Sequence, residues 1–136
     1  MNQKEDIIQS IISELRKKSD DLEGVYLFGS RSTDEFTIDS DWDFAYLSRK
    51  VLDDEINWEL KVLIESKFEA KIDLVDLYKA TTVLQIQVLK TGKLVWVGNK
   101  SKVKHFEYLA LSYYQKLNDE QADILKDIKA RGNIYG

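Results

Sequence analysis

Apolar residues at the start of the chain recur with helical spacing. Between Asn2 and Lys18 they stand at Ile7, Ile8, Ile11, Ile12 and Leu15. A stripe of this kind is typical of a helix with one buried face, and Asn2 with Glu5 matches the pattern of a capping pair. The pattern predicts an amphipathic first helix.

Four short stretches have the residue types of β-strands, near 25–28, 41–47, 71–76 and 94–97. They are rich in β-branched and aromatic residues and too short for helices. Because side chains alternate along a strand, Asp41 and Asp43 lie on one face of the second stretch, and Trp42 lies on the other with the remaining aromatics. In the third stretch, Asp73 faces one way and Asp76 the other.

Helical patterns separate these strands. A helix capped by Asp53 or Asp54 is predicted to run to about residue 68, with a buried stripe of Ile56, Leu60, Leu63, Ile64 and Phe68. A second helix starts at Thr81 or Thr82 and is ended by Gly92. Two further helices are predicted at about 101–117 and 119–130. The last residues, 131–136, lack periodicity and are expected to form a flexible tail.

The length and composition fit one globular domain. The chain has 136 residues, of which 43% are hydrophobic and 32% charged, ordinary values for a folded domain with a modest core. We expect a single domain over residues 1–136. The sequence contains no cysteine, which excludes disulfides, thiolate zinc sites and a cysteine nucleophile and favours a reducing, cytoplasmic location.

Charge and the shortage of histidine exclude further classes. The formal net charge is −4, so the chain lacks the basic field that sequence-independent nucleic-acid binding uses, and we expect no direct nucleic-acid contact. No apolar run reaches the roughly 18 residues of a membrane-spanning helix. His105 is the only histidine, too few for a histidine metal site or a catalytic triad. Carboxylates must therefore carry any enzymatic chemistry.

Three aspartates within strands indicate a metal site. A buried ionised carboxylate costs several kcal/mol unless it is paired or holds a cation. Asp41 and Asp43 lie roughly 6 to 7 Å apart on one face, and Asp73 joins them if its strand is a neighbour, with Asp76 as the competing third acid. Crowded carboxylates repel unless one or two divalent ions neutralise them, and an all-oxygen ligand set suits Mg²⁺.

A Gly-Ser turn precedes the acidic pair. In "FGSRSTDEFTIDSDWDFA", ten residues separate the pair Gly29 and Ser30 from Asp41. Glycine lets backbone approach a ligand closely, and turn amides together with the Ser30 hydroxyl can hold phosphate oxygens. Phosphate beside magnesium indicates a nucleotide, and two metal ions can activate an attacking oxygen. The combination predicts phosphoryl or nucleotidyl transfer.

Three stretches match one family in order and context. "YLFGSRS", "SDWDFAYL" and "KIDLVDL" resemble the signature of the DNA polymerase β-like nucleotidyltransferase superfamily, above all its minimal nucleotidyltransferases. The later stretch "TTVLQIQVLKTGKLVWVG" is similar to antitoxin members encoded beside HEPN-domain ribonuclease toxins. The resemblance implies an α+β fold, in which a small mixed sheet is packed with helices in a single nucleotidyltransferase domain.

The resemblance also implies an activity. Its members are antitoxins of a type VII-like system: protein adenylyltransferases that use ATP and Mg²⁺ to attach AMP to a tyrosine of the cognate HEPN toxin. By position, Asp41 and Asp43 would bind two metal ions, and Asp73 would bind the catalytic ion and help deprotonate the attacking hydroxyl.

The resemblance assigns the phosphates to the Gly-Ser turn. Gly29 and Ser30 would hold the β- and γ-phosphates of ATP, and Arg31 and Ser40 are further candidates for nucleotide contacts. Many members continue the motif as Gly-Ser-x-Ala-Arg-Gly, whereas this chain has Thr33-Asp34 in place of Arg-Gly. That difference leaves Arg31 as the only nearby cation.

Two other functions fit the same residues. The chain could neutralise a toxin by complex formation alone, without catalysis. It could also transfer a nucleotide to a small hydroxylated molecule such as an aminoglycoside, although a chain of this length has few residues with which to enclose a sugar.

Overall fold

A mixed four-stranded sheet forms the centre of the protein. The computed structural model describes residues 3–29 and 41–130, with side chains described up to residue 122. The strands are β1 (Leu22–Phe28), β2 (Trp42–Ser48), β3 (Ile72–Asp76) and β4 (Lys93–Val97), in the order β3-β2-β1-β4. β1 runs antiparallel to β2 and β4, and β2 runs parallel to β3. The α+β fold with a small mixed sheet is therefore confirmed.

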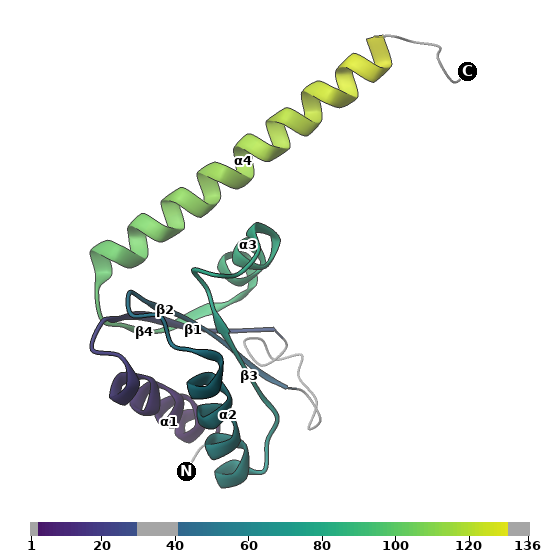
Figure 1. Ribbon diagram of the computed structural model, residues 1–136. Coiled ribbons are helices and arrows are strands. Elements are labelled where there is room, and N and C mark those ends of the chain that lie inside the picture. Colours follow the sequence, from purple (N-terminus) through teal and green to yellow (C-terminus); the bar gives the residue numbers. More distant parts are fainter. Residues whose placement is uncertain (1–2, 30–40, 131–136) are drawn as a thin grey trace.

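Helices cover both faces of this sheet (Figure 1). α1 (Gln3–Lys18) and α2 (Asp54–Phe68) lie on one face, and α3 (Thr82–Thr91) and α4 (Lys100–Ala130) lie on the other. α2 makes the crossover between the parallel strands β2 and β3, a connection that such strands require. Within the described residues, no helix combines the length and the apolar character needed to span a bilayer.

The alternation of side chains in β1 and β2 divides the core into two clusters. Val25 and Phe44 belong to the cluster under α1 and α2, and Tyr26 and Ala45 belong to the cluster under α3 and α4. The isoleucines and leucine that predicted the first helix are all buried in the first cluster. Burying these side chains contributes about 1.5 to 3 kcal/mol each, which fixes both helix layers on the sheet.

Helix caps agree with the sequence. The Asp53 side chain accepts a hydrogen bond from the Ile56 amide at 2.9 Å, and Thr81 caps α3 in the same way through the Leu84 amide. Gly92 ends α3, and its amide donates to the Val88 carbonyl at 2.8 Å. These caps satisfy amide and carbonyl groups that a helix end otherwise leaves unpaired.

Three expectations about the elements were wrong. The first strand begins at Leu22, three residues earlier than predicted, because Leu22 and Glu23 are buried although they follow an acidic run. Leu63 is 49% exposed, since the buried side of α2 is centred on Leu60 and Ile64. The two last helices are one helix, α4, of 31 residues. The expected tail at 131–136 lies outside the described residues.

Candidate functional site

The β2–β3 pair brings two of the three predicted acids together. Asp43 and Asp73 are register partners in this parallel pair, and neighbouring strands lie about 4.8 Å apart. Both side chains project from the face that α3 and α4 cover, because Ala45 and Val75, two residues further along each strand, pack in that cluster. The expectation that the strand of Asp73 is a neighbour is confirmed.

The electrostatics of Asp43 show that the three carboxylates share one region. Burial raises the pKa of Asp43 above its ordinary value, and the negative charges of Asp73 and then Asp41 raise it further. Asp43 is half-buried, whereas Asp41 and Asp73 are exposed. The group is thus an acidic cluster open to solvent on one side, in which repulsion is not offset by any described basic side chain.

Gly29 places the end of β1 against this cluster. Its backbone has φ of +72°, in the left-handed region that favours glycine. A Cβ at this position would collide with Oδ2 of Asp43. The missing side chain therefore lets the Gly29 backbone and the Asp43 carboxylate lie side by side, a closeness that the Gly-Ser motif alone did not reveal.

The opposite face of β2 holds the site in place. Trp42 is 4% exposed and Phe44 is fully buried, and both belong to the core under α1 and α2. Trp42 points away from the carboxylates, as expected from strand alternation. Rigid packing on one face of a strand fixes the direction of the side chains on the other.

Asp76, the competing third acid, lies elsewhere. It is the register partner of Tyr46, three residues beyond Asp73, and its side chain accepts a hydrogen bond from the Tyr78 amide. Asp73 is therefore the acid that lies beside Asp43. Ser30, Arg31, Ser40, and the pair Thr33 and Asp34 lie outside the described residues.

The carboxylates suit a divalent cation chemically, although they do not form a closed ligand set. Among the residues that the structure describes, no three His, Cys, Asp or Glu side chains are already arranged around one point. Like charges keep such groups apart until a cation neutralises them. The all-oxygen donors and the unbalanced charge at Asp43 fit one or two Mg²⁺ ions.

Comparison with known proteins decides the family. Residues 9–101 match the family model described as "Polymerase beta, Nucleotidyltransferase", a range that contains β1 to β4 and all three acids. The chain belongs to this nucleotidyltransferase family. The matched residues end near the start of α4, so the remainder of that helix lies beyond the part that the family shares.

Several relatives of this nucleotidyltransferase are known. The chain is 38% identical to the protein adenylyltransferase MntA of Shewanella oneidensis. The alignment covers 88% of this chain and 86% of MntA. A crystal structure of a toxin–antitoxin pair with AMP-PNP has a chain that is 36% identical, with a TM-score of 0.76, over 94% of this chain and 98% of that one. A structure of the tri-AMPylated S. oneidensis HEPN toxin with its MNT antitoxin has 35% identity and a TM-score of 0.72, over 92% and 98%.

Proposed function

We propose that this nucleotidyltransferase is the antitoxin of a type VII-like toxin–antitoxin pair and transfers AMP from ATP to a tyrosine of a HEPN-domain ribonuclease toxin. The pairing of Asp43 with Asp73 in the β2–β3 register is the observation that carries the proposal. The similarity to MntA covers nearly the whole chain, and related chains have been seen with AMP-PNP and with an AMPylated toxin.

The reaction requires one bond to form and one to break. The acceptor tyrosine Oη attacks the α-phosphorus of ATP, the bond from that phosphorus to the bridging oxygen breaks, and pyrophosphate leaves with the electron pair. Asp73 accepts the tyrosyl proton, as general bases do when they lie beside the attacking group. Asp41, Asp43 and Asp73 would hold Mg²⁺, which when bound neutralises the carboxylates and the triphosphate.

The rest of the site positions the nucleotide. The close approach of Gly29 to Asp43 supports a role in which the Gly29 backbone would contact a phosphate held beside the metal ligands. Ser30, Arg31 and Ser40 are proposed to contact the nucleotide. A protein acceptor suits a single domain of this size, because the partner supplies its own reacting residue and the chain need not enclose it.

The test is a mass measurement on the partner protein. Incubation of the chain with ATP, Mg²⁺ and its proposed HEPN partner is expected to raise the mass of that partner in steps of one AMP. The double variant Asp41→Asn, Asp43→Asn is expected to abolish the increase, and Asp73→Asn to slow it on the order of 10²-fold or more. An unmodified partner in the presence of the unaltered chain would refute the proposal.

Asp76→Asn is the matched control, because Asp76 lies in β3 like Asp73 but outside the acidic cluster. It is expected to transfer AMP at close to the unaltered rate. The variants also separate transfer from complex formation: if the double variant protects cells from the toxin at normal expression, binding alone neutralises the toxin.

A further inference from the structure

A second pocket lies at the other end of the sheet. It has a volume of about 440 Å³, within the range of roughly 300 to 1,000 Å³ that is usual for small-ligand sites. Four segments line it: β1 at Glu23, the end of β2 with the residues after it, the end of β3 with the residues after it, and α4 between Lys102 and Leu109. Ser48, in the pocket wall, stands five residues after Asp43, or about 17 Å along β2, so the pocket is separate from the acidic cluster.

The wall of this pocket is mainly apolar and aromatic. Val51 and Leu109 are 60% and 51% exposed and line the pocket from segments that are far apart in sequence. Tyr78 and Phe106 form an edge-to-face pair with ring centroids 5.5 Å apart. Exposed apolar surface that is concave and contains aromatic rings is typical of a site for a flat aromatic group.

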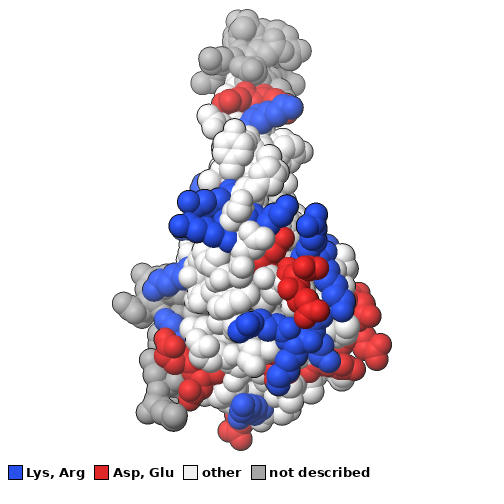
Figure 2. Space-filling model, turned by 90° about the vertical axis from the view of Figure 1, so that its left-hand side faces the viewer, with Lys and Arg blue, Asp and Glu red and all other residues white. Residues whose placement is uncertain are grey.

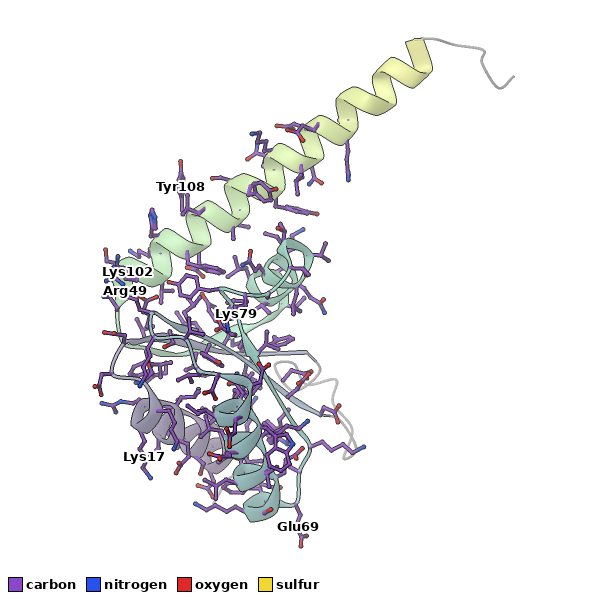
Figure 3. All side chains as sticks on the ribbon, in the orientation of Figure 1. Lys17, Arg49, Glu69, Lys79, Lys102 and Tyr108 are labelled. Atoms are coloured by element: carbon purple, nitrogen blue, oxygen red, sulfur yellow. The ribbon has the colours of Figure 1, made fainter. Side chains whose placement is uncertain are left out.

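Three cations surround the apolar wall. Arg49, Lys79 and Lys102 line the pocket, and all three side chains are exposed. Figure 3 shows Arg49 and Lys102 together beside the start of α4 and Lys79 below the same helix. Lys and Arg side chains also gather around the base of α4 on the face shown in Figure 2. Within the described part of the chain, none of the three forms an ion pair.

The acids of the pocket are already engaged. Glu23 is only 5% exposed, and its carboxylate accepts a hydrogen bond from the Tyr78 hydroxyl. Asp76 accepts from the Tyr78 amide at 3.1 Å. Arg49 is held at its backbone, where its amide donates to the Asp21 carbonyl at 3.1 Å. Because both Tyr78 donors are neutral, both carboxylates keep their charge, and the lining sets three cations against two acids next to an apolar wall.

We propose that this pocket binds a small aromatic anion, whose ring packs against Tyr78, Phe106 and Leu109 and whose anionic group lies between Arg49, Lys79 and Lys102. Charge complementarity selects the anion, and the aromatic wall selects the ring. A mononucleotide has this chemistry, and so do aromatic carboxylates and sulfonates. The site does not depend on the proposed transfer reaction, because it shares no residue with the acidic cluster.

Binding is tested on the full chain with anilinonaphthalene sulfonate as the probe. In a titration of ¹⁵N-labelled protein, the amide signals of residues 48–51, 76–79 and 102–109 are expected to shift, while those of β2 near Asp43 stay unchanged. Fluorescence titration gives the affinity, which the double variant Arg49→Ala, Lys102→Ala is expected to lower at least tenfold. Neutral N-phenylnaphthylamine, which lacks the sulfonate, is expected to bind more weakly than the anionic probe.

The matched control is Lys17→Ala with Lys67→Ala, which removes two exposed lysines from α1 and α2 and is expected to leave the affinity unchanged. Shifts outside the pocket, equal affinity of the Arg49/Lys102 variant, or equal binding of the neutral probe would each overturn the proposal. A titration with AMP as a second probe distinguishes the two classes of ligand. If AMP shifts the amide signals of the same residues, the ligand is a nucleotide; if only the sulfonate shifts them, the ligand is another aromatic anion.

Discussion

At the residue scale, Gly29 offers a sharp test of the site. The substitution Gly29→Ala places a Cβ against Oδ2 of Asp43 and puts an L-residue at φ of +72°. The left-handed backbone is expected to cost about 1 to 2 kcal/mol, measured as a lower free energy of unfolding in urea. Because the Asp43 carboxylate must move, AMP transfer is expected to fall on the order of 100-fold.

Two measurements on this variant keep the effects apart. Circular dichroism and the unfolding curve report the backbone cost, and transfer measured well below the unfolding midpoint reports the displaced carboxylate. A variant that folds and transfers AMP at the unaltered rate would show that the Asp43 position seen beside Gly29 is not needed.

The acids themselves were predictable from sequence, whereas their surroundings were not. Alternation along a strand places Asp43 and Trp42 on opposite faces correctly, since it depends only on local geometry, whereas Asp41, expected within the strand, lies just before β2. That β2 and β3 are neighbours, and that Asp73 and not Asp76 stands beside Asp43, depends on the register between strands. The exposure of Leu63 depends on how α2 is rotated about its axis against the sheet. The spacing of apolar residues does not decide whether a residue at the border of the apolar stripe is buried.

At the element scale, buried tyrosines join helices to the sheet. The hydroxyl of Tyr46 in β2 donates to Oδ1 of Asn57 in α2 at 2.8 Å, and that of Tyr26 in β1 donates to Glu107 in α4 at 3.0 Å. Burial is the main cause that raises the pKa of both tyrosines above the ordinary value of 10.0. Each bond requires a protonated phenol, so these junctions are sensitive to alkali.

Stability is therefore expected to fall at high pH. Burial, with the charges of Asp76 and Asp54, raises the pKa of Tyr46 to about 12. The unfolded chain loses the phenolic proton near pH 10 while the folded chain retains it to about pH 12, so the unfolded state is favoured as the pH rises between these values. Below pH 10 the protonated Tyr46 contributes its full stabilisation to the folded state. Urea unfolding across this range should show the loss, and Tyr46→Phe should make it smaller.

Tyr113→Phe is the control for this pH dependence, because Tyr113 is 52% exposed. It is expected to leave the alkaline loss unchanged, which separates the buried phenol of Tyr46 from an exposed phenol. An identical pH profile for the Tyr46→Phe variant would contradict the assignment to Tyr46.

The sequence predicted most elements because their signals are local. The caps Asp53 and Thr81 and the terminator Gly92 mark α2 and α3 within a residue. The division of α4 was wrong because Asn118 and Asp119 resemble a helix boundary. Without glycine or proline nearby, these residues cost only a few tenths of a kcal/mol inside a helix, and the helix continues.

At the scale of the whole molecule, the two faces of the sheet differ in what they carry. The face under α1 and α2 is a continuous apolar core. The face under α3 and α4 carries the acidic cluster at one end of β2 and the apolar, cationic pocket at the other.

The last half of α4 extends beyond this body (Figure 1). A helix of 31 residues is about 46 Å long, and among its side chains described up to residue 122 the buried ones, Val103, Phe106 and Ala110, lie in the first part. The ammonium group of Lys90 in α3 lies 4.7 Å from the ring centroid of Tyr114 in α4. Among the contacts of α4 with the rest of the domain that the structure describes, this is the one furthest along the helix. Beyond residue 118 the backbone of α4 therefore continues from a packed helix and extends away from the sheet and the other helices (Figure 1).

A chain shortened to end at Asn118 is expected to keep the fold. The removed helical residues, 119–130, are at the lower limit of the roughly 12 to 15 that form even a marginal helix alone, so they contribute helical signal but little stability. The free energy of unfolding is expected to change by less than about 1 kcal/mol, while far-UV circular dichroism loses helical signal. A chain shortened to end at Val103 is the contrasting case, because it removes Phe106, Ala110 and the Tyr26–Glu107 bond and should unfold at much lower urea. Equal destabilisation by the two truncations would show that the projecting half belongs to the cooperative unit.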